Sequence, residues 1–419
     1  MKKIKYVIFL MLTMGFLASC VDYEDATEPL KATSIRLVAP ETFVDNSALA
    51  NRTITLQDGS HSTTVTTNGS GVATIETLTP GIYNISASWA ISSTEYASYT
   101  GGQQHALSST HKLTMAGSLT EQHITADQTI DMPMSVSEDQ DIVISKIYFA
   151  TSKDNNNKNY EAGRYIELFN QSDDSVDVAG LYIGLTEADS PQAYTLENLM
   201  DANGGHPDSL LLKMVFRIPA DTVVKIAPGG TLLIVNSAID HTKNNTKFEH
   251  DLTGADFEAK DRSERPVTNN PNVPALELVY SWLKNVSNLN MHANGLCGVV
   301  IFRTDEDVKN WPVTYKYPNT ATSGNQWKLL SKRLVLDGVE CLPNKQTTGP
   351  NMSLKRLYAD IDASSAHIEA TGGRTGEVVY RKTSDRKSDG GHLMLVDTNN
   401  SANDFQVSTT IKPREYDGN

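Results

Sequence analysis

The side chains best suited to metal chemistry lie between residues 240 and 261, in the run DHTKNNTKFEHDLTGADFEAKD. Imidazole and carboxylate groups are ligands that divalent metals accept, and this run carries them at Glu249, Asp256 and Asp261 as well as at the three residues His241, His250 and Asp251. The two histidines are nine positions apart and lack the spacing that places two ligands on one helical turn. We therefore interpret the run as a solvent-exposed connection, and keep these three residues as the ones that would hold a metal if one bound.

Aspartate-rich turns offer oxygen ligands for calcium, at Asp154 with residues 155–157 and at Asp173–Asp174. They lack the spacing and the closing glutamate of a calcium loop, and turn-forming Asp and Asn explain them adequately. No GxSxG elbow, Walker loop or metalloprotease signature occurs in the sequence. We expect no cofactor, with calcium as the alternative. We also expect no catalytic residues, with a metal-dependent hydrolase acting through His250 or Asp251 as the alternative.

The N-terminal segment carries a different chemistry, centred on Cys20. A short cationic start precedes an apolar run over residues 6–17, which is the layout of a secretory signal. The run is too short to span a bilayer core of about 30 Å as a helix. Leu17-Ala18-Ser19-Cys20 resembles the bacterial lipobox, which implies removal of residues 1–19 and diacyl or triacyl lipid on Cys20. An ordinary signal with an incidental cysteine is the alternative.

Acidic residues follow the cysteine within residues 20–33, which we interpret as an acidic tether. They resemble the signal that sends lipoproteins of Bacteroides-type bacteria to the outer face of the outer membrane, and a solvated linker is the alternative. Removing residues 1–19 takes away three lysines and no acids, so the net charge of −14 becomes −17. Such a balance argues against nucleic acid as a partner, because binding to it relies on Lys and Arg. We expect a lipid-anchored protein at the outer membrane, exposed at the cell surface.

Two further cysteines, Cys297 and Cys341, complete the count of three. Outside the cytoplasm such a pair can form a disulfide. Two buried free thiols are the alternative, because the sequence does not place the two Cα atoms within bridging distance. No Cys/His cluster has the spacing of a zinc site.

Residues 34–138 read as a small all-β module of short strands and polar turns. Apolar and polar residues alternate with a period of two, and turn signals stand at Asn68-Gly69 and Pro80-Gly81. The stretch TTNGSGVATIETLTPGIYNISASW resembles transthyretin-like or collagen-adhesin-B-like β-sandwich modules. The residues that carry this resemblance are Gly71, Val72, Ile75, Leu78, Pro80, Gly81, Tyr83 and Ile85.

Residues 139–419 resemble a lamin-tail domain, an immunoglobulin-like β-sandwich. The stretch RYIELFNQSDDSVDVAGLYIG carries the resemblance, and we expect its Glu167 to form local bonds. Long insertions interrupt the pattern at residues 192–217 and 239–294, where a specific function would reside. The residues that match the family's motifs are Tyr165, Ile166, Leu168, Asn170, Val176, Asp177, Gly180, Tyr182, Pro228-Gly229-Gly230 and residues 297–303, 353–356 and 397–405.

The whole arrangement resembles an uncharacterised family of surface lipoproteins from Bacteroides-type bacteria. Its members are typically encoded beside TonB-dependent outer-membrane receptors. The resemblance implies a non-enzymatic accessory or binding component of an uptake system, with such a receptor or other surface lipoproteins as partners. A stand-alone carbohydrate-binding or adhesive surface protein is the alternative.

Overall fold

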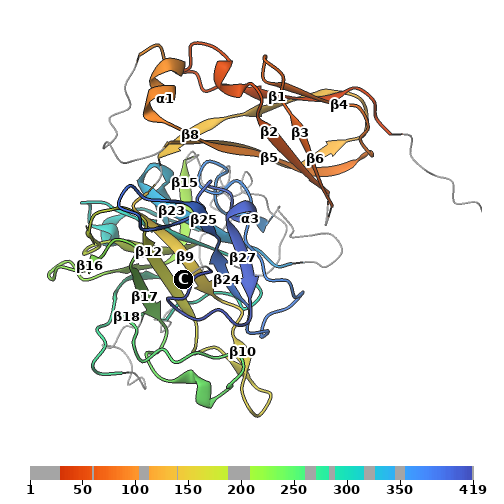
Figure 1. Cartoon of the computed structure of the whole chain (residues 1–419). Coiled ribbons are helices and arrows are strands. Elements are labelled where there is room, and N and C mark those ends of the chain that lie inside the picture. The colour runs from red at the N-terminus through yellow and green to blue at the C-terminus, as the bar shows by residue number, and fades with distance from the viewer. Residues whose placement is uncertain are drawn as a thin grey trace, which may run out of the picture.

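Strands dominate the computed structural model, as the all-β prediction requires (Figure 1). Among the described residues the α-helices are α1 (Ser93–Tyr99) and α3 (Ser401–Asp404), and none is long and apolar enough to cross a membrane. The multiple sheets form β-sandwich-like layers, so the predicted fold class is confirmed. The structure describes residues 29–58, 61–102, 113–138, 140–186, 208–259, 270–282, 288–315, 326–344 and 354–417.

The N-terminal part packs two sheets around one apolar core, and it lies at the top of Figure 1. Side chains in β1 alternate between buried and exposed, as the period-two pattern predicts. One sheet has the order β4 (Val72–Ile75), β1 (Thr33–Val38), β7 (Thr129–Pro133). The other has the order β3 (His61–Thr66), β2 (Thr53–Asp58), β5 (Gly81–Ile91), β6 (Leu113–Ile124), β8 (Ser135–Glu138).

The predicted turn at Asn68 is present and its chemistry is visible. The Asn68 side-chain oxygen accepts hydrogen bonds from the backbone N–H groups of Ser70 and Val72, at 2.9 and 3.1 Å. Gly71 has a φ of +76°, and a Cβ there would lie 2.9 Å from the Cβ of Leu49. A turn that needs both positive φ and close approach favours glycine at this position.

The C-terminal part contains two larger sheets and three small ones. The six-stranded sheet has the order β18 (Phe257–Glu258), β17 (Thr231–Val235), β12 (Tyr165–Asn170), β9 (Ile142–Tyr148), β24 (Val378–Arg381), β27 (Phe405–Ser408). The seven-stranded sheet has the order β21 (Val313–Tyr315), β22 (Gln326–Ser331), β15 (Ser209–Arg217), β14 (Tyr182–Thr186), β20 (Cys297–Phe302), β23 (Val335–Cys341), with β19 (Glu277–Ser281) also pairing with β15. The small sheets pair β10 (Ser152–Lys153) with β11 (Asn159–Tyr160), β13 (Val176–Asp177) with β16 (Lys225–Ile226), and β25 (Thr383–Lys387) with β26 (Leu393–Leu395).

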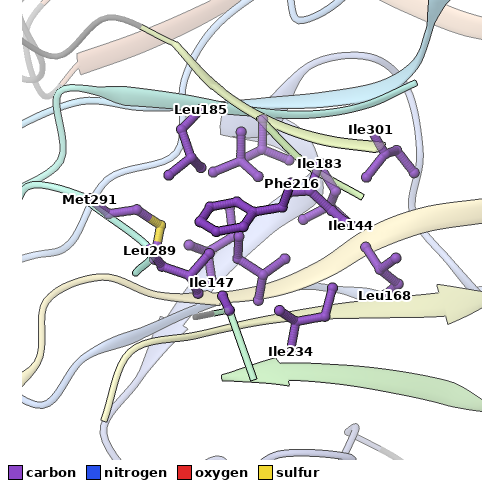
Figure 2. Packing of buried hydrophobic residues seen from close by; sticks show 14 of the residues in the cluster. Ile144, Ile147, Leu168, Ile183, Leu185, Phe216, Ile234, Leu289, Met291 and Ile301 are labelled. Carbon is purple, nitrogen blue, oxygen red and sulfur yellow. The ribbon is translucent and has the colours of Figure 1, made fainter. Parts of the chain in front are cut away.

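The main core lies between these two larger sheets (Figure 2). Phe216 of β15 points from the seven-stranded sheet toward Ile144 and Ile147 of β9. Every residue of β9 and β12 is buried, so both strands are covered on both faces. Continuous apolar content is typical of strands covered in this way. This buried centre fixes the strand ends that position the candidate site.

The prediction that residues 192–217 are an insertion is wrong for the second part of this range. Residues 209–217 form β15, which pairs with β14, β19 and β22 inside the seven-stranded sheet. Its LLLKMVF run buries side chains on both faces, a signal of a core strand that the interpretation as an insertion overlooked. The segment predicted as an insertion at 239–294 likewise contributes β18 and β19 to the sheets, so it is in part integral to the fold. Residues 187–207, 260–269 and 283–287 lie outside the described residues.

Candidate functional site

The backbone after β17 folds back on itself, so the backbone at His241 lies next to the backbone at His250 and Asp251. Asp240 and Asp251 form an isolated antiparallel bridge, and the His241 N–H donates to the His250 carbonyl at 3.1 Å. The side chains, however, do not converge. Within the described ranges, no group of three or more His, Cys, Asp or Glu side chains is arranged to hold a metal ion.

His241 is a structural histidine. Its Nδ1 lies 2.6 Å from the Tyr160 hydroxyl, and its Nε2 lies 2.8 Å from the Ser237 carbonyl oxygen. The side chain is fully buried. Because both ring nitrogens already have hydrogen-bond partners, His241 joins its loop to β11 and has no nitrogen left for a ligand.

His250 has a different environment. Its ring packs edge-on against Tyr148 and Tyr165, with centroids 5.4 and 5.7 Å away. The Nε2 atom is buried and has no hydrogen-bond partner. Burial lowers the pKa of His250 to about 4, so the imidazole is neutral at physiological pH. Asp251, next along the chain, uses one carboxylate oxygen as a cap that accepts from the N–H and hydroxyl of Thr253.

Glu249, one of the carboxylates that the sequence places in this polar run, is buried with a strongly shifted pKa. Its Oε1 accepts hydrogen bonds from the Ser152 hydroxyl at 2.6 Å and the Tyr148 hydroxyl at 3.0 Å. Its Oε2 is buried without a partner. Burial raises the pKa of Glu249 to about 7, although these two hydrogen bonds lower it in part. The two hydroxyls lie about a hundred residues earlier in the chain, so no local pattern could have indicated them.

A cleft of about 630 Å³ opens beside these residues. One wall is the loop over residues 242–254, and the other is the C-terminal segment 409–415. Most of the residues that line it are polar or charged, with both signs of charge, so a small polar molecule would find hydrogen-bonding groups there. The residues that line it are Leu233, Thr242, Thr246, Lys247, Glu249, His250, Asp251, Gly254, Thr409, Thr410, Lys412, Pro413, Arg414 and Glu415.

The C-terminal wall of the cleft is fastened to the core by Glu167. One carboxylate oxygen accepts the backbone N–H of Arg414 at 2.6 Å, and the other lies 2.6 Å from both the Tyr416 hydroxyl and the Lys146 ammonium group. The Lys146 ammonium also lies 3.6 Å from the centre of the Tyr416 ring. The expectation that Glu167 forms local bonds is therefore wrong, since its carboxylate bonds a segment almost 250 residues further along the chain.

The Arg414 side chain reinforces the same wall. Its guanidinium contacts Asp256 at 2.8 Å and the Gly254 carbonyl at 3.0 Å. Both walls of the cleft are thus held by buried or charge-assisted bonds, so the cleft is largely preformed.

The aspartates proposed as calcium ligands serve as turn and loop acceptors. One oxygen of Asp154 accepts the N–H groups of Asn156 and Lys158, each at 2.8 Å. Asp173 accepts the Gly390 N–H at 2.9 Å and the Ser388 hydroxyl. The Asp154 bonds match the turn interpretation, whereas Asp173 bonds a loop more than 200 residues further along the chain.

Cys297 and Cys341 lie opposite each other on neighbouring strands, and both are buried cysteines that no disulfide joins. Of the two states left open by the sequence, this structure contains the reduced one. Cys20, the predicted lipidation residue, lies outside the described residues.

Comparisons with known proteins give one family match and one similar crystal structure. Residues 227–412 match a family described as "Protein of unknown function (DUF4876)". The fold is similar to the crystal structure of a DUF4876 family protein from Bacteroides thetaiotaomicron VPI-5482, with a TM-score of 0.56 and 19% identity over 90% of this chain and 94% of that one. No curated protein matches the chain. The family match covers less than half of the chain, and the structural similarity shows that the two proteins share a fold.

Proposed function

We propose that this chain is an outer-membrane surface lipoprotein that binds a small polar molecule in the cleft, as a non-enzymatic accessory component of a TonB-dependent uptake system. The observation that carries the binding role is the cleft of about 630 Å³ between residues 242–254 and 409–415. Its volume falls within the range of roughly 300–1,000 Å³ that small-molecule sites occupy. The lipobox-like Cys20 and the similarity to a Bacteroides protein support the cellular setting.

The polar side chains of the cleft favour binding over turnover. Asp251 accepts a hydrogen bond from the Thr253 hydroxyl, and Arg414 forms an ion pair with Asp256. Each of these contacts holds one wall of the cleft in place. Walls fixed before a ligand arrives reduce the ordering cost of binding. Lys247 and Lys412 line opposite walls of the cleft, where their cations are available to anionic or hydroxyl groups of a ligand.

The anchor and the partner are tested together by purifying the full chain from detergent-solubilised outer membranes. We expect acyl chains on Cys20 by mass spectrometry and a TonB-type barrel among the recovered proteins. A Cys20→Ser variant should lose the membrane fraction. An unmodified thiol, cytosolic fractionation or reproducible absence of a barrel would contradict the proposal, and glycan binding without a barrel would favour the adhesive alternative.

The cleft is tested by filling it. Gly254 lines the cleft, and a Cβ built there meets nothing within 4 Å, so Gly254→Trp should occupy the cleft without disturbing the fold. Gly372 is equally unobstructed and does not line the cleft, so Gly372→Trp is the matched control. Native mass spectrometry of the protein from its source membranes should show a bound small molecule that Gly254→Trp loses and Gly372→Trp retains. Equal retention in both variants would place the ligand elsewhere.

A further inference from the structure

The strands β20 and β23 place two cysteine side chains directly opposite each other. Their antiparallel register pairs Cys297 with Cys341, and the register stays regular until the shift between Ile301 and Phe302. Directly opposite residues of an antiparallel pair project to the same face of the sheet, with Cα atoms about 4.5–5.5 Å apart. A disulfide needs Cα atoms about 4.4–6.8 Å apart. The register therefore places the two Cα atoms within the range that a disulfide spans, which the sequence alone did not do.

The backbone around both cysteines is held on several sides. The Leu296 N–H donates to the Cys341 carbonyl at 2.7 Å, and the Leu342 N–H donates to the Ala366 carbonyl at 3.0 Å. Cys341 also forms a parallel bridge with Ala366. Both side chains are 1% exposed and belong to the same apolar cluster, which keeps the two sulfur atoms among the same neighbours.

We propose that Cys297 and Cys341 form a cross-strand disulfide while the chain folds, and that this structure contains the reduced form of that bond. The oxidant is a disulfide donor, either a dithiol oxidoreductase or a small-molecule disulfide. One cysteine thiolate attacks the donor disulfide and releases one donor sulfur as a thiol. The second thiolate then displaces the other donor sulfur, so two cysteine thiols become one disulfide, and the donor disulfide becomes two thiols that take up the two protons.

The timing follows from burial. Burial raises the pKa of the Cys341 thiol well above its usual value, so the folded state holds very little of the reactive thiolate. The thiols are open to a donor before the two larger sheets close over them, and the folded reduced protein is resistant. The disulfide joins the two ends of the loop 297–341. This loop contains β21 and β22.

The experiment refolds the full chain carrying Cys20→Ser, so that only two thiols are present, from urea with either oxidised glutathione or a reductant. We expect the protein refolded with oxidised glutathione to have an intact mass lower by two hydrogen atoms and to show no free thiol when denatured. Its melting temperature should exceed that of the reduced product by roughly 5–10 °C, because the cross-link restricts the unfolded chain. The folded reduced protein should react with oxidised glutathione at least tenfold more slowly than the unfolded chain.

The matched controls are Cys297→Ala and Cys341→Ala, each alone and both together, in the same background. The double variant should melt at one temperature whether or not oxidised glutathione was present. Two free thiols, or glutathione attached to each cysteine, in a refolded native protein would overturn the proposal. This outcome is independent of the membrane setting, because the refolding assay uses neither the lipid nor the receptor.

Discussion

The guanidinium group of Arg381 and the carboxylate of Asp337 form a two-pronged ion pair inside the fold, with Nη2 3.0 Å from Oδ1 and 2.9 Å from Oδ2. Both side chains are only 2% exposed. The same guanidinium also meets Asp397 at 2.9 Å and Asp404 at 3.3 Å. One buried cation thus faces three carboxylates, and the cluster carries excess negative charge whenever all three are ionised.

The first prediction concerns how the stability of this cluster depends on pH. Burial raises the pKa of Asp337 to about 6 and that of Asp404 to about 7, against the opposing attraction of Arg381. A carboxyl group whose pKa is higher in the folded state stabilises the fold fully at a pH below its unfolded pKa of about 3.9, and this stabilisation is lost as the pH rises through the folded value. The contribution of the cluster to the free energy of unfolding should therefore fall between pH 4 and 7.

Urea denaturation of the wild type and Asp404→Asn at pH 5, 6, 7 and 8 measures this dependence. Asparagine does not titrate, so the variant should show a flatter decline of the free energy of unfolding with pH. Identical pH dependence in the two proteins would contradict the assignment of Asp404.

The second prediction removes the cation. Arg381→Met leaves the buried carboxylates of Asp337 and Asp404 and the partly buried one of Asp397 without their counter-ion, and should cost about 3–5 kcal/mol at pH 7. The loss should be smaller at pH 5, because protonated carboxyl groups are less costly to bury. Arg36→Met is the control: its ion pair with Asp131 is exposed, with 53% and 49% of the two side chains accessible, and the change should alter stability little. Equal losses for the two variants in urea denaturation would show that burial of the Arg381 pair is unimportant.

The strands of this fold could be predicted from local sequence patterns more readily than its polar clusters. Alternation in β1 and the Asn68 turn are visible within a few residues, because strand and turn signals depend on near neighbours. Asp397 and Asp404 stand in a stretch that resembles a closing turn, yet nothing in that stretch indicates their shared partner Arg381. That partner is supplied by β24, whose place beside β9 is set by topology.

In the candidate site, too, the local sequence indicates some residues, while long-range packing supplies their partners. The 240–261 run was identified as polar, but burial of Glu249 depends on Tyr148 at the end of β9 and Ser152 in β10. The second wall of the cleft lies in the C-terminal segment, which is positioned by Glu167 through contacts with no periodic signature. Sequence patterns located one wall of the cleft, and long-range packing supplies the other.

The third prediction tests how the C-terminal wall is fastened. The Tyr416 hydroxyl lies 2.6 Å from Glu167 Oε1 and 2.8 Å from the Ser145 hydroxyl. Tyr416→Phe keeps the ring over Lys146 but leaves this buried carboxylate with one donor fewer, at a cost of about 1–3 kcal/mol. We expect faster proteolysis of the C-terminal segment and a lower free energy of unfolding in urea.

Tyr380→Phe is the control for that variant. Its hydroxyl contacts Asp417 at 3.1 Å in a partly exposed position, so water can replace the lost bond. A loss for Tyr380→Phe as large as for Tyr416→Phe would contradict the fastening role assigned to Glu167.

The fourth prediction concerns protonation beside the cleft. With its pKa lowered to about 4 by burial, His250 should keep a constant imidazole proton shift in NMR spectra between pH 8 and 5.5, where a free histidine titrates near 6.5. Because this folded pKa is depressed, the stabilisation from neutral His250 is present above pH 6.5 and is lost as the pH falls toward 4. A His250 titration midpoint near 6.5 would show that the ring is open to water.

The fifth prediction separates close packing at Glu249 from a general effect of altering the cleft. A Cβ at Gly163 would lie 2.0 Å from Glu249 Oε2, so Gly163→Ala forces this carboxylate to move, and we expect the move to weaken the bonds of its Oε1 to Ser152 and Tyr148. The weakened bonds should cost about 1–3 kcal/mol and shift the NMR signals of the neighbouring His250. Gly254→Ala changes the same cleft where a Cβ meets nothing within 4 Å, and it should leave the free energy of unfolding equal or slightly higher, since alanine restricts the unfolded chain. If both variants unfold at the same urea concentration, the Glu249 carboxylate is free to move, and the preformed wall inferred for this cleft is wrong.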